Sequence, residues 1–279
     1  MSLIFSIESV FDFERKCLER NREIMSWIDE KLQFMVPVDE SRERLLVFYK
    51  QMVKSFVDNS EFIFDSLQKN GNLEPLANIT RTIIELFCRA MYLNKVGEKE
   101  KLKKVLACDL YSLAMCEMDN QGLACIIEEC QDLAQSPGIT LPTVKELKEW
   151  IKVGIYNLGQ SKELHKFRQN FFFPSVKQMI REHLDEKEEP QIPKRILYGY
   201  YSMVSDQIHG NPYLAQHIPC RKPTNRILAL LITLSLRFLK EISALTNFPM
   251  EKVDSLILSW QKYFKNGFVD LWILSTHSR

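Results

Sequence analysis

The sequence predicts an all-α protein, an antiparallel bundle of about nine or ten helices. Apolar residues recur at the three- and four-residue spacing of a helix along nearly the whole chain. No Asn-Gly or Asp-Gly pair stands between two alternating runs of β-branched residues, so hairpin signals are missing. Hydrophobic residues make up 46% and charged residues 26% of the 279 residues, as in globular proteins with a sizeable core.

Residues that stop helices divide the N-terminal half of the chain. The helices expected there span residues 7–34, 39–69, 73–96, 99–118 and 121–135. Pro37 ends the first, Asn70-Gly71 ends the second, and Gly97 ends the third. The clearest break in the chain is 136–142, which reads Ser-Pro-Gly-Ile-Thr-Leu-Pro and is expected to be a loop.

The C-terminal half continues the helical pattern. A sixth helix is expected to begin after Thr143, and the remaining expected helices span 161–186, 193–209, 224–246 and 250–264. Pro174 is expected to break the first of these, and an acidic linker covers 185–189. A short apolar tail follows at 268–275.

We expect one helical domain over 1–279, with an N-terminal helical hairpin at 1–70, a core at about 71–246 and a C-terminal helix and tail at 247–279. The longest strongly apolar run, 227–236, is too short to span a membrane. The N-terminus lacks the basic start of a signal peptide, and the seven cysteines have irregular spacings. These features predict a cytoplasmic protein with no membrane contact, no metal site and no cofactor.

Charge is unevenly distributed, although the net charge is only +1. Residues 1–140 hold 17 basic and 23 acidic side chains, whereas residues 141–279 hold 20 basic and 13 acidic ones. Such an asymmetry either marks a half that faces a polyanion or reflects two solvated surfaces that differ by chance.

The expected helix 73–96 is apolar over most of its circumference, which is typical of a largely buried helix. One polar arc interrupts it, formed by Asn78, Arg81, Glu85, Arg89 and Tyr92. Arg81, Glu85 and Arg89 follow at i,i+4 spacing, so the carboxylate is expected between two guanidiniums. The arc is either a structural ion network or a pocket wall whose arginines bind phosphate or carboxylate.

The expected helix 193–209 carries a second polar arc beside its apolar face. Its members are Tyr198, Ser202, Ser205 and His209, and Tyr201 lies next to them on the apolar side. His209 is in the last turn, where the helix dipole favours the imidazolium and suits it for acid–base chemistry. The simpler alternative is a histidine that caps the helix end. Basic residues surround this segment, namely Lys194, Arg195, Arg221, Lys222 and Arg226.

These residues resemble a bacterial family of all-helical proteins of unknown function, related to the HEPN (higher eukaryotes and prokaryotes nucleotide-binding) and abortive-infection domains. Arg81-x-x-x-Glu85 followed by Tyr92-Leu93, and the distant Tyr201-x-x-x-Ser205-x-x-x-His209-Gly210, carry the resemblance over about residues 40–245. It implies a HEPN-like core in which the Arg/Glu helix packs beside the Ser/His helix. Many HEPN proteins are metal-independent endoribonucleases or partners in antitoxin and phage-defence systems.

The HEPN nuclease motif places an arginine four to six residues before the histidine, whereas this chain has no arginine at those offsets before His209. The sequence therefore leaves open whether the chain is an enzyme. The first hypothesis is an interaction or defence-related module with a protein partner, antitoxin-like or a defence component, in the form of a homodimer. The second is a metal-independent ribonuclease, or an RNA- or nucleotide-binding protein, and the third is a bundle that binds a small molecule.

In the ribonuclease hypothesis, His209, Arg81, Glu85 and Ser205 are the catalytic candidates. The ligand-binding candidates are Arg89, Tyr92, Tyr198, Tyr201, Ser202, Arg221, Lys222 and Arg226. A catalytic site predicts that these residues converge on an open cleft, and a structural seam predicts that they bond to one another. The aromatic run Phe171-Phe172-Phe173 is expected to pack in the core, with an exposed base-stacking patch as the alternative.

Overall fold

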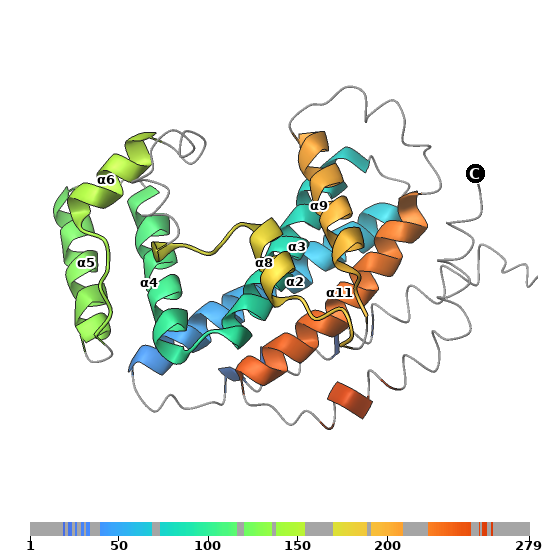
Figure 1. Ribbon diagram of the computed structural model, residues 1–279, viewed down its shortest axis with the longest axis horizontal. Coiled ribbons are helices and arrows are strands. Elements are labelled where there is room, and N and C mark those ends of the chain that lie inside the picture. Colours follow the sequence, from blue (N-terminus) through green and yellow to red (C-terminus); the bar gives the residue numbers. More distant parts are fainter. Residues whose placement is uncertain are drawn as a thin grey trace, which may run out of the picture. The chain divides into compact units, whose positions relative to one another are not determined.

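The computed structural model describes residues 40–68, 73–115, 120–135, 138–153, 170–188, 191–208 and 223–246, with isolated helical residues between 19 and 33 and between 251 and 258. The all-α prediction is confirmed, because every regular element in these ranges is a helix and no strand occurs in them. The helices are α2 (Glu40–Gln68), α3 (Leu73–Lys95), α4 (Glu98–Met115), α5 (Asn120–Gln135), α6 (Val144–Val153), α8 (Val176–His183), α9 (Lys194–Ile208) and α11 (Pro223–Leu245) (Figure 1).

Six expected helices match described ones closely, namely 39–69, 73–96, 99–118, 121–135, 193–209 and 224–246. The expected helix 161–186 is represented by α8, which begins shortly after Pro174, at the break that this proline predicts. The expected helices 7–34 and 250–264 lie mostly outside the described residues, and those of their residues that are described are helical. The expected tail 268–275 lies outside the described residues.

Local chemistry sets the helix ends. Gly138, with a φ of 63°, follows α5, and its amide donates to the Gln135 carbonyl at 2.9 Å. The Ile139 amide donates to the Ala134 carbonyl at 2.8 Å, which completes a Schellman motif. Helix α6 begins with a capping box, in which the Thr143 amide donates to Glu146 at 2.7 Å and the Glu146 amide to the Thr143 hydroxyl at 3.3 Å.

The chain forms two compact units. The first comprises residues 1–35, 50–94 and 179–279, and so contains most of α2 and α3 together with α9 and α11. Its core is apolar: Phe56 of α2 and Phe238 of α11 stack with ring centroids 4.0 Å apart, and Ile83, Phe87 and Leu234 are fully buried. Burial of this kind supplies most of the stability of a helical bundle.

The second unit comprises residues 36–49 and 95–178, in which α4, α5 and α6 pack on one another. The described part of the break, residues 138–142, therefore lies inside this unit as a loop. The run 171–173 is buried there: the Phe173 ring stacks on Phe48, and the Phe172 ring meets Tyr111 edge-on. These contacts confirm that the aromatic run serves packing.

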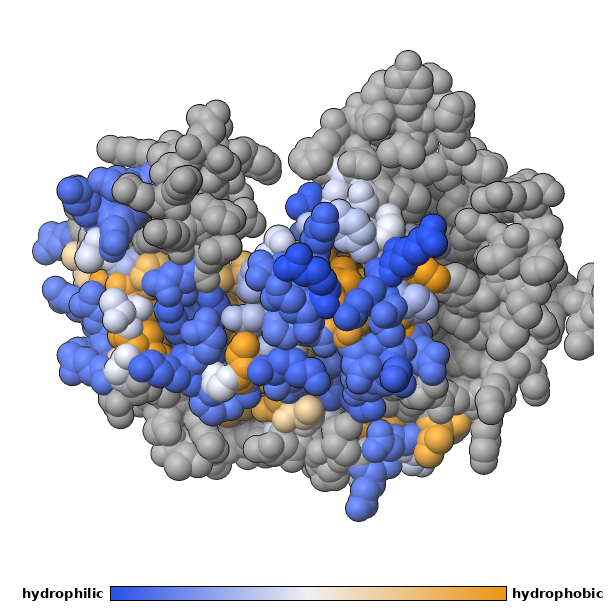
Figure 2. All heavy atoms as spheres, in the orientation of Figure 1, coloured by the Kyte–Doolittle hydropathy of each residue, from blue (hydrophilic) through white to orange (hydrophobic). Residues whose placement is uncertain are grey.

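Most of the described charged residues lie on the outside of the helices, with Lys104, Arg237 and Glu241 as buried exceptions. Figure 2 shows that hydrophilic residues cover most of the described surface on the face drawn, with hydrophobic residues in small areas between them. None of the described helices is long and apolar enough to cross a membrane. This distribution is typical of amphipathic helices around an apolar core.

Candidate functional site

Helix α3 presents the first polar arc on an otherwise buried helix. Ile83, Ile84 and Phe87 are fully buried, whereas Arg81 and Glu85, one turn apart, are partly exposed. The Arg81 Nε donates a hydrogen bond to the Glu85 Oε1 at 2.9 Å, with side-chain exposures of 32% and 27%. This is the i,i+4 pair that the sequence predicts.

Helix α9 brings Tyr201 to the same carboxylate. The Tyr201 hydroxyl donates to the Glu85 Oε1 at 3.3 Å, and the Arg81 Cζ lies 5.7 Å from the centroid of the Tyr201 ring. Arg81, Glu85 and Tyr201 thus form one cluster, called here the α3–α9 cluster. It joins residues 116 positions apart in the sequence, and one carboxylate oxygen holds both donors.

The pKa values in this cluster follow from burial and from the shared carboxylate. Burial raises the pKa of Tyr201, and the negative charge of Glu85 adds to the effect, while Arg81 and Ser205 act in the opposite direction. For Arg81, burial lowers the pKa, but the hydrogen bond and charge of Glu85 and the contact with Tyr201 together raise it. The cluster therefore keeps a neutral phenol beside a paired guanidinium at neutral pH.

The remaining described candidates on α9 lie on or near the same face. Ser205 is one turn beyond Tyr201 and half-buried, and its hydroxyl oxygen is buried. Tyr198 and Ser202 are half-buried. Helix α9 thus continues the polar arc in both directions from Tyr201.

Two candidates on α3 lie beyond the cluster. Arg89 is half-buried, one turn after Glu85, and the ion pair described for Glu85 is with Arg81. Tyr92 is only 7% exposed, and its ring meets the His183 ring edge-on with centroids 5.2 Å apart. Tyr92 therefore packs between α3 and α8, and its ring faces the core.

The other candidates cannot be placed. His209, Arg221 and Lys222 lie outside the described residues, and Arg226 lies on α11 with its side chain outside the description. The structure therefore brings together Arg81, Glu85 and Tyr201, with Ser205 one turn away, and leaves the convergence on His209 as a prediction. Among the described residues, no group of three or more His, Cys, Asp or Glu side chains is arranged to hold a metal ion.

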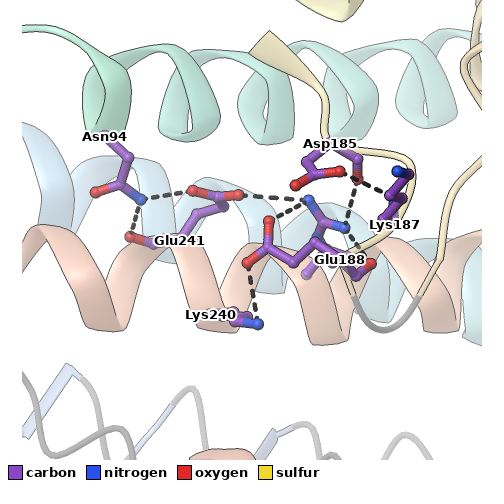
Figure 3. A network of polar contacts seen from close by, with 7 residues as sticks. Asn94, Asp185, Lys187, Glu188, Lys240 and Glu241 are labelled. Atoms are coloured by element: carbon purple, nitrogen blue, oxygen red, sulfur yellow. Dashed lines mark hydrogen bonds and ion pairs between the residues drawn. The ribbon is translucent and has the colours of Figure 1, made fainter.

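The sequence reasoning missed a second polar cluster, centred on Arg237 of α11. Figure 3 labels six of its members, among them Asn94, Glu188 and Glu241. Arg237 is fully buried, and its guanidinium bonds to the Glu188 carboxylate at 2.9 Å. The Asn94 side chain of α3 donates to the carboxylate of Glu241, one turn after Arg237, at 2.6 Å. A signal was present, since Arg237 and Glu241 are an i,i+4 pair on an apolar helix, as Arg81 and Glu85 are.

Comparison of the chain with known protein families, with curated proteins and with solved structures finds no match.

Proposed function

We propose that this chain is a non-catalytic helical interaction module whose α3–α9 cluster is a structural polar seam. The observation that carries the proposal is the shared acceptor: the Glu85 Oε1 receives both Arg81 and Tyr201. Groups that satisfy one another in this way are typical of a buried or half-buried structural network. A protein partner, antitoxin-like or a defence component, is the partner class that the family resemblance implies.

The energetics favour this role over catalysis. An incoming phosphate would have to compete with a carboxylate already 2.9 Å from the Arg81 guanidinium. It would also have to approach Glu85, whose negative charge repels it. A catalytic arginine normally keeps its donors directed at the position where charge develops, and here Nε is directed at Glu85.

One observation favours a second candidate function, a metal-independent ribonuclease or an RNA- or nucleotide-binding protein. The Arg81 side chain is 32% exposed, so an anion can reach it from solvent while Nε stays bonded to Glu85. In this alternative His209 acts as general acid or base, and Arg81 or Arg89 stabilises the charged phosphate.

The deciding experiment incubates a mixed RNA pool with the protein, without metal and with a chelator, for the wild type, His209→Ala and Arg81→Gln. The interaction module predicts no cleavage and no RNA retention by any of the three proteins. Cleavage by the wild type that both substitutions abolish would establish the ribonuclease and overturn the proposal.

A positive test of the interaction module uses native purification of the full chain from its source cells after nuclease treatment. We expect a protein partner in stoichiometric amount that survives the nuclease. Loss of every partner after nuclease treatment would instead indicate that RNA mediates the association, which favours the second candidate.

A further inference from the structure

Arg237 connects α11 to a turn that is distant in the sequence. Its Nη1 donates to the backbone carbonyls of Asp185 at 3.2 Å and Glu188 at 2.7 Å, and its Nη2 donates to the Glu188 Oε2 at 2.9 Å. Lys240, on the same helix, pairs with the other oxygen of Glu188 at 3.0 Å. Figure 3 shows that Asp185, Lys187 and Glu188 sit on the loop that faces α11.

The same turn also holds the first residue of α9. The Lys194 amide, which has no partner within its own helix at this position, donates to the Glu186 Oε1 at 2.7 Å. The Lys194 ammonium donates to the Arg181 carbonyl at the end of α8, at 2.9 Å. Inside the turn, the Lys187 amide donates to the Asp185 carboxylate at 2.9 Å. The turn is therefore bonded on one side to α11 and on the other to α9.

We propose that Arg237 and the turn 185–188 form a latch that sets the position of α9, and through it the Tyr201–Glu85 contact. The proposal concerns regulation of the α3–α9 cluster, and it rests on the seam role proposed above. The bonded path runs from Arg237 to Glu188, along the turn to Glu186, and from Glu186 to the Lys194 amide.

A helix transmits a displacement of its first residue because its backbone bonds make it stiff over short lengths. Tyr201 lies two turns after Lys194, about 10 Å along the helix axis. Its hydrogen bond to Glu85 is 3.3 Å long, already beyond the usual range for O–H···O, so a shift of α9 that lengthens it by a few tenths of an ångström breaks it. The contact is therefore a sensitive reporter of where α9 starts.

The contacts of Arg237 favour a single position of the turn 185–188. Arg237 is completely buried, and its planar guanidinium bonds to three oxygens whose directions fix the turn. Glu241, 7% exposed, lies 3.8 Å from the guanidinium and accepts the Asn94 amide, which links the latch to the end of α3. Losing one partner of such a buried network leaves the others unsatisfied, so intermediate positions are disfavoured.

The test places 3-fluorotyrosine at position 201 of the full chain and records its fluorine resonance. Glu186→Ala cuts the latch from α9 and leaves the Arg237 contacts in place, and Glu188→Ala removes the Arg237 ion pair. Glu85→Ala gives the resonance of the broken contact. Asp65→Ala, which removes an exposed carboxylate of α2 in the same unit, is the matched control.

We expect the resonance in Glu186→Ala and Glu188→Ala to move at least halfway toward its position in Glu85→Ala, while Asp65→Ala leaves it unchanged. A resonance at the wild-type position in both latch variants would overturn the proposal, even if their unfolding temperatures fall, because the turn would then contribute stability alone. Glu186 is exposed whereas Glu188 is half-buried, so Glu186→Ala is the less disruptive of the two variants and is expected to fold.

Hydrogen exchange along α9 separates the latch from the seam. If Glu85→Ala does not move the fluorine resonance, the structural seam fails, and the latch is then decided by the α9 amides. Faster exchange over 197–205 in Glu186→Ala, with no change in Asp65→Ala, supports the latch, and unchanged exchange overturns it. Cleavage of RNA that depends on His209 would overturn the proposed function. It would change neither the fluorine resonance at position 201 nor the exchange of the α9 amides.

Discussion

Glu85 illustrates how one residue joins two helices, because its Oε1 accepts hydrogen bonds from Arg81 of the same helix and from Tyr201 of α9. We expect Glu85→Ala and Tyr201→Phe each to lower the free energy of unfolding. Their combined effect should be smaller than the sum by about 0.5–1 kcal/mol, since both remove the same bond. Urea denaturation of the two single variants and the double variant measures this coupling.

The matched control for this cycle pairs Tyr201→Phe with Asp65→Ala, an exposed carboxylate elsewhere in the same unit. Their effects should add without coupling, because distant side chains do not share partners. Full additivity in the Glu85 cycle as well would mean that the hydrogen bond at 3.3 Å contributes nothing to the seam.

Single residues also show which parts of the site could be predicted. The Arg81–Glu85 bond followed from i,i+4 spacing, which is a local property of any helix. The approach of Tyr201 to Glu85 across 116 residues was expected only through the family resemblance. The spacing of residues along the sequence does not determine the distance between two helices.

Gly138 and Gly199 illustrate two opposite effects of glycine, which stabilises a left-handed helix end and destabilises a helix interior. Gly138 has a φ of 63° at the end of α5, where any other residue is strained, while Gly199 lies exposed in α9 with no atom within 4 Å of an added Cβ. We expect Gly138→Ala to destabilise by about 1 kcal/mol and Gly199→Ala to stabilise by up to about 1 kcal/mol. Chemical denaturation of the two variants measures both effects.

The outcome at Gly138 tests conformation and not crowding, because the nearest atom to an added Cβ is the Lys99 Nζ at 3.6 Å, an ordinary contact. A stabilising Gly138→Ala would contradict the left-handed conformation of the Schellman motif. A destabilising Gly199→Ala would show that α9 needs its glycine for a reason other than helix propensity.

At the scale of elements, the sequence predicted most of the fold. Helix ends depend on residues within a few positions of each other, such as Gly138 after α5, the Thr143–Glu146 capping box and Pro174 before α8. These signals are readable in a single sequence. The loop at 136–142 was predicted for the same reason.

The whole molecule was less predictable, because its organisation depends on contacts between distant segments. The Arg237 cluster joins residues 49 and 52 positions apart, and the local pair Arg237–Glu241 on an apolar helix does not identify these distant partners. The two-unit division cuts through α2, which the sequence correctly predicts as a continuous helix. Periodicity identifies helices, and tertiary packing decides which of them share a core.

Buried titratable groups determine how the stability of the whole chain depends on pH. Burial raises the pKa of the Cys88 thiol far above its ordinary value, with a smaller contribution from the Glu85 charge and an opposing one from Arg89. Above about pH 9 the unfolded chain loses this proton while the native protein keeps it, so the native state binds more protons and stability falls as pH rises. Burial of Tyr49 acts in the same direction from about pH 10.

Lys104 acts in the opposite direction, because burial lowers its pKa and the native state then binds fewer protons than the unfolded chain. The pH dependence of the whole chain therefore does not report on Cys88 alone.

The effect of the Cys88 thiol is measured as the difference in free energy of unfolding between the wild type and Cys88→Ala, by urea denaturation under reducing conditions. We expect the free energy of unfolding of the wild type to exceed that of Cys88→Ala by a constant amount below about pH 8. This difference should shrink by about 1 kcal/mol by about pH 10. The variant Cys125→Ala, which removes an exposed thiol, is the control for the substitution itself. Parallel pH profiles for wild type and Cys88→Ala would mean that the Cys88 thiol titrates alike in the folded and unfolded chain.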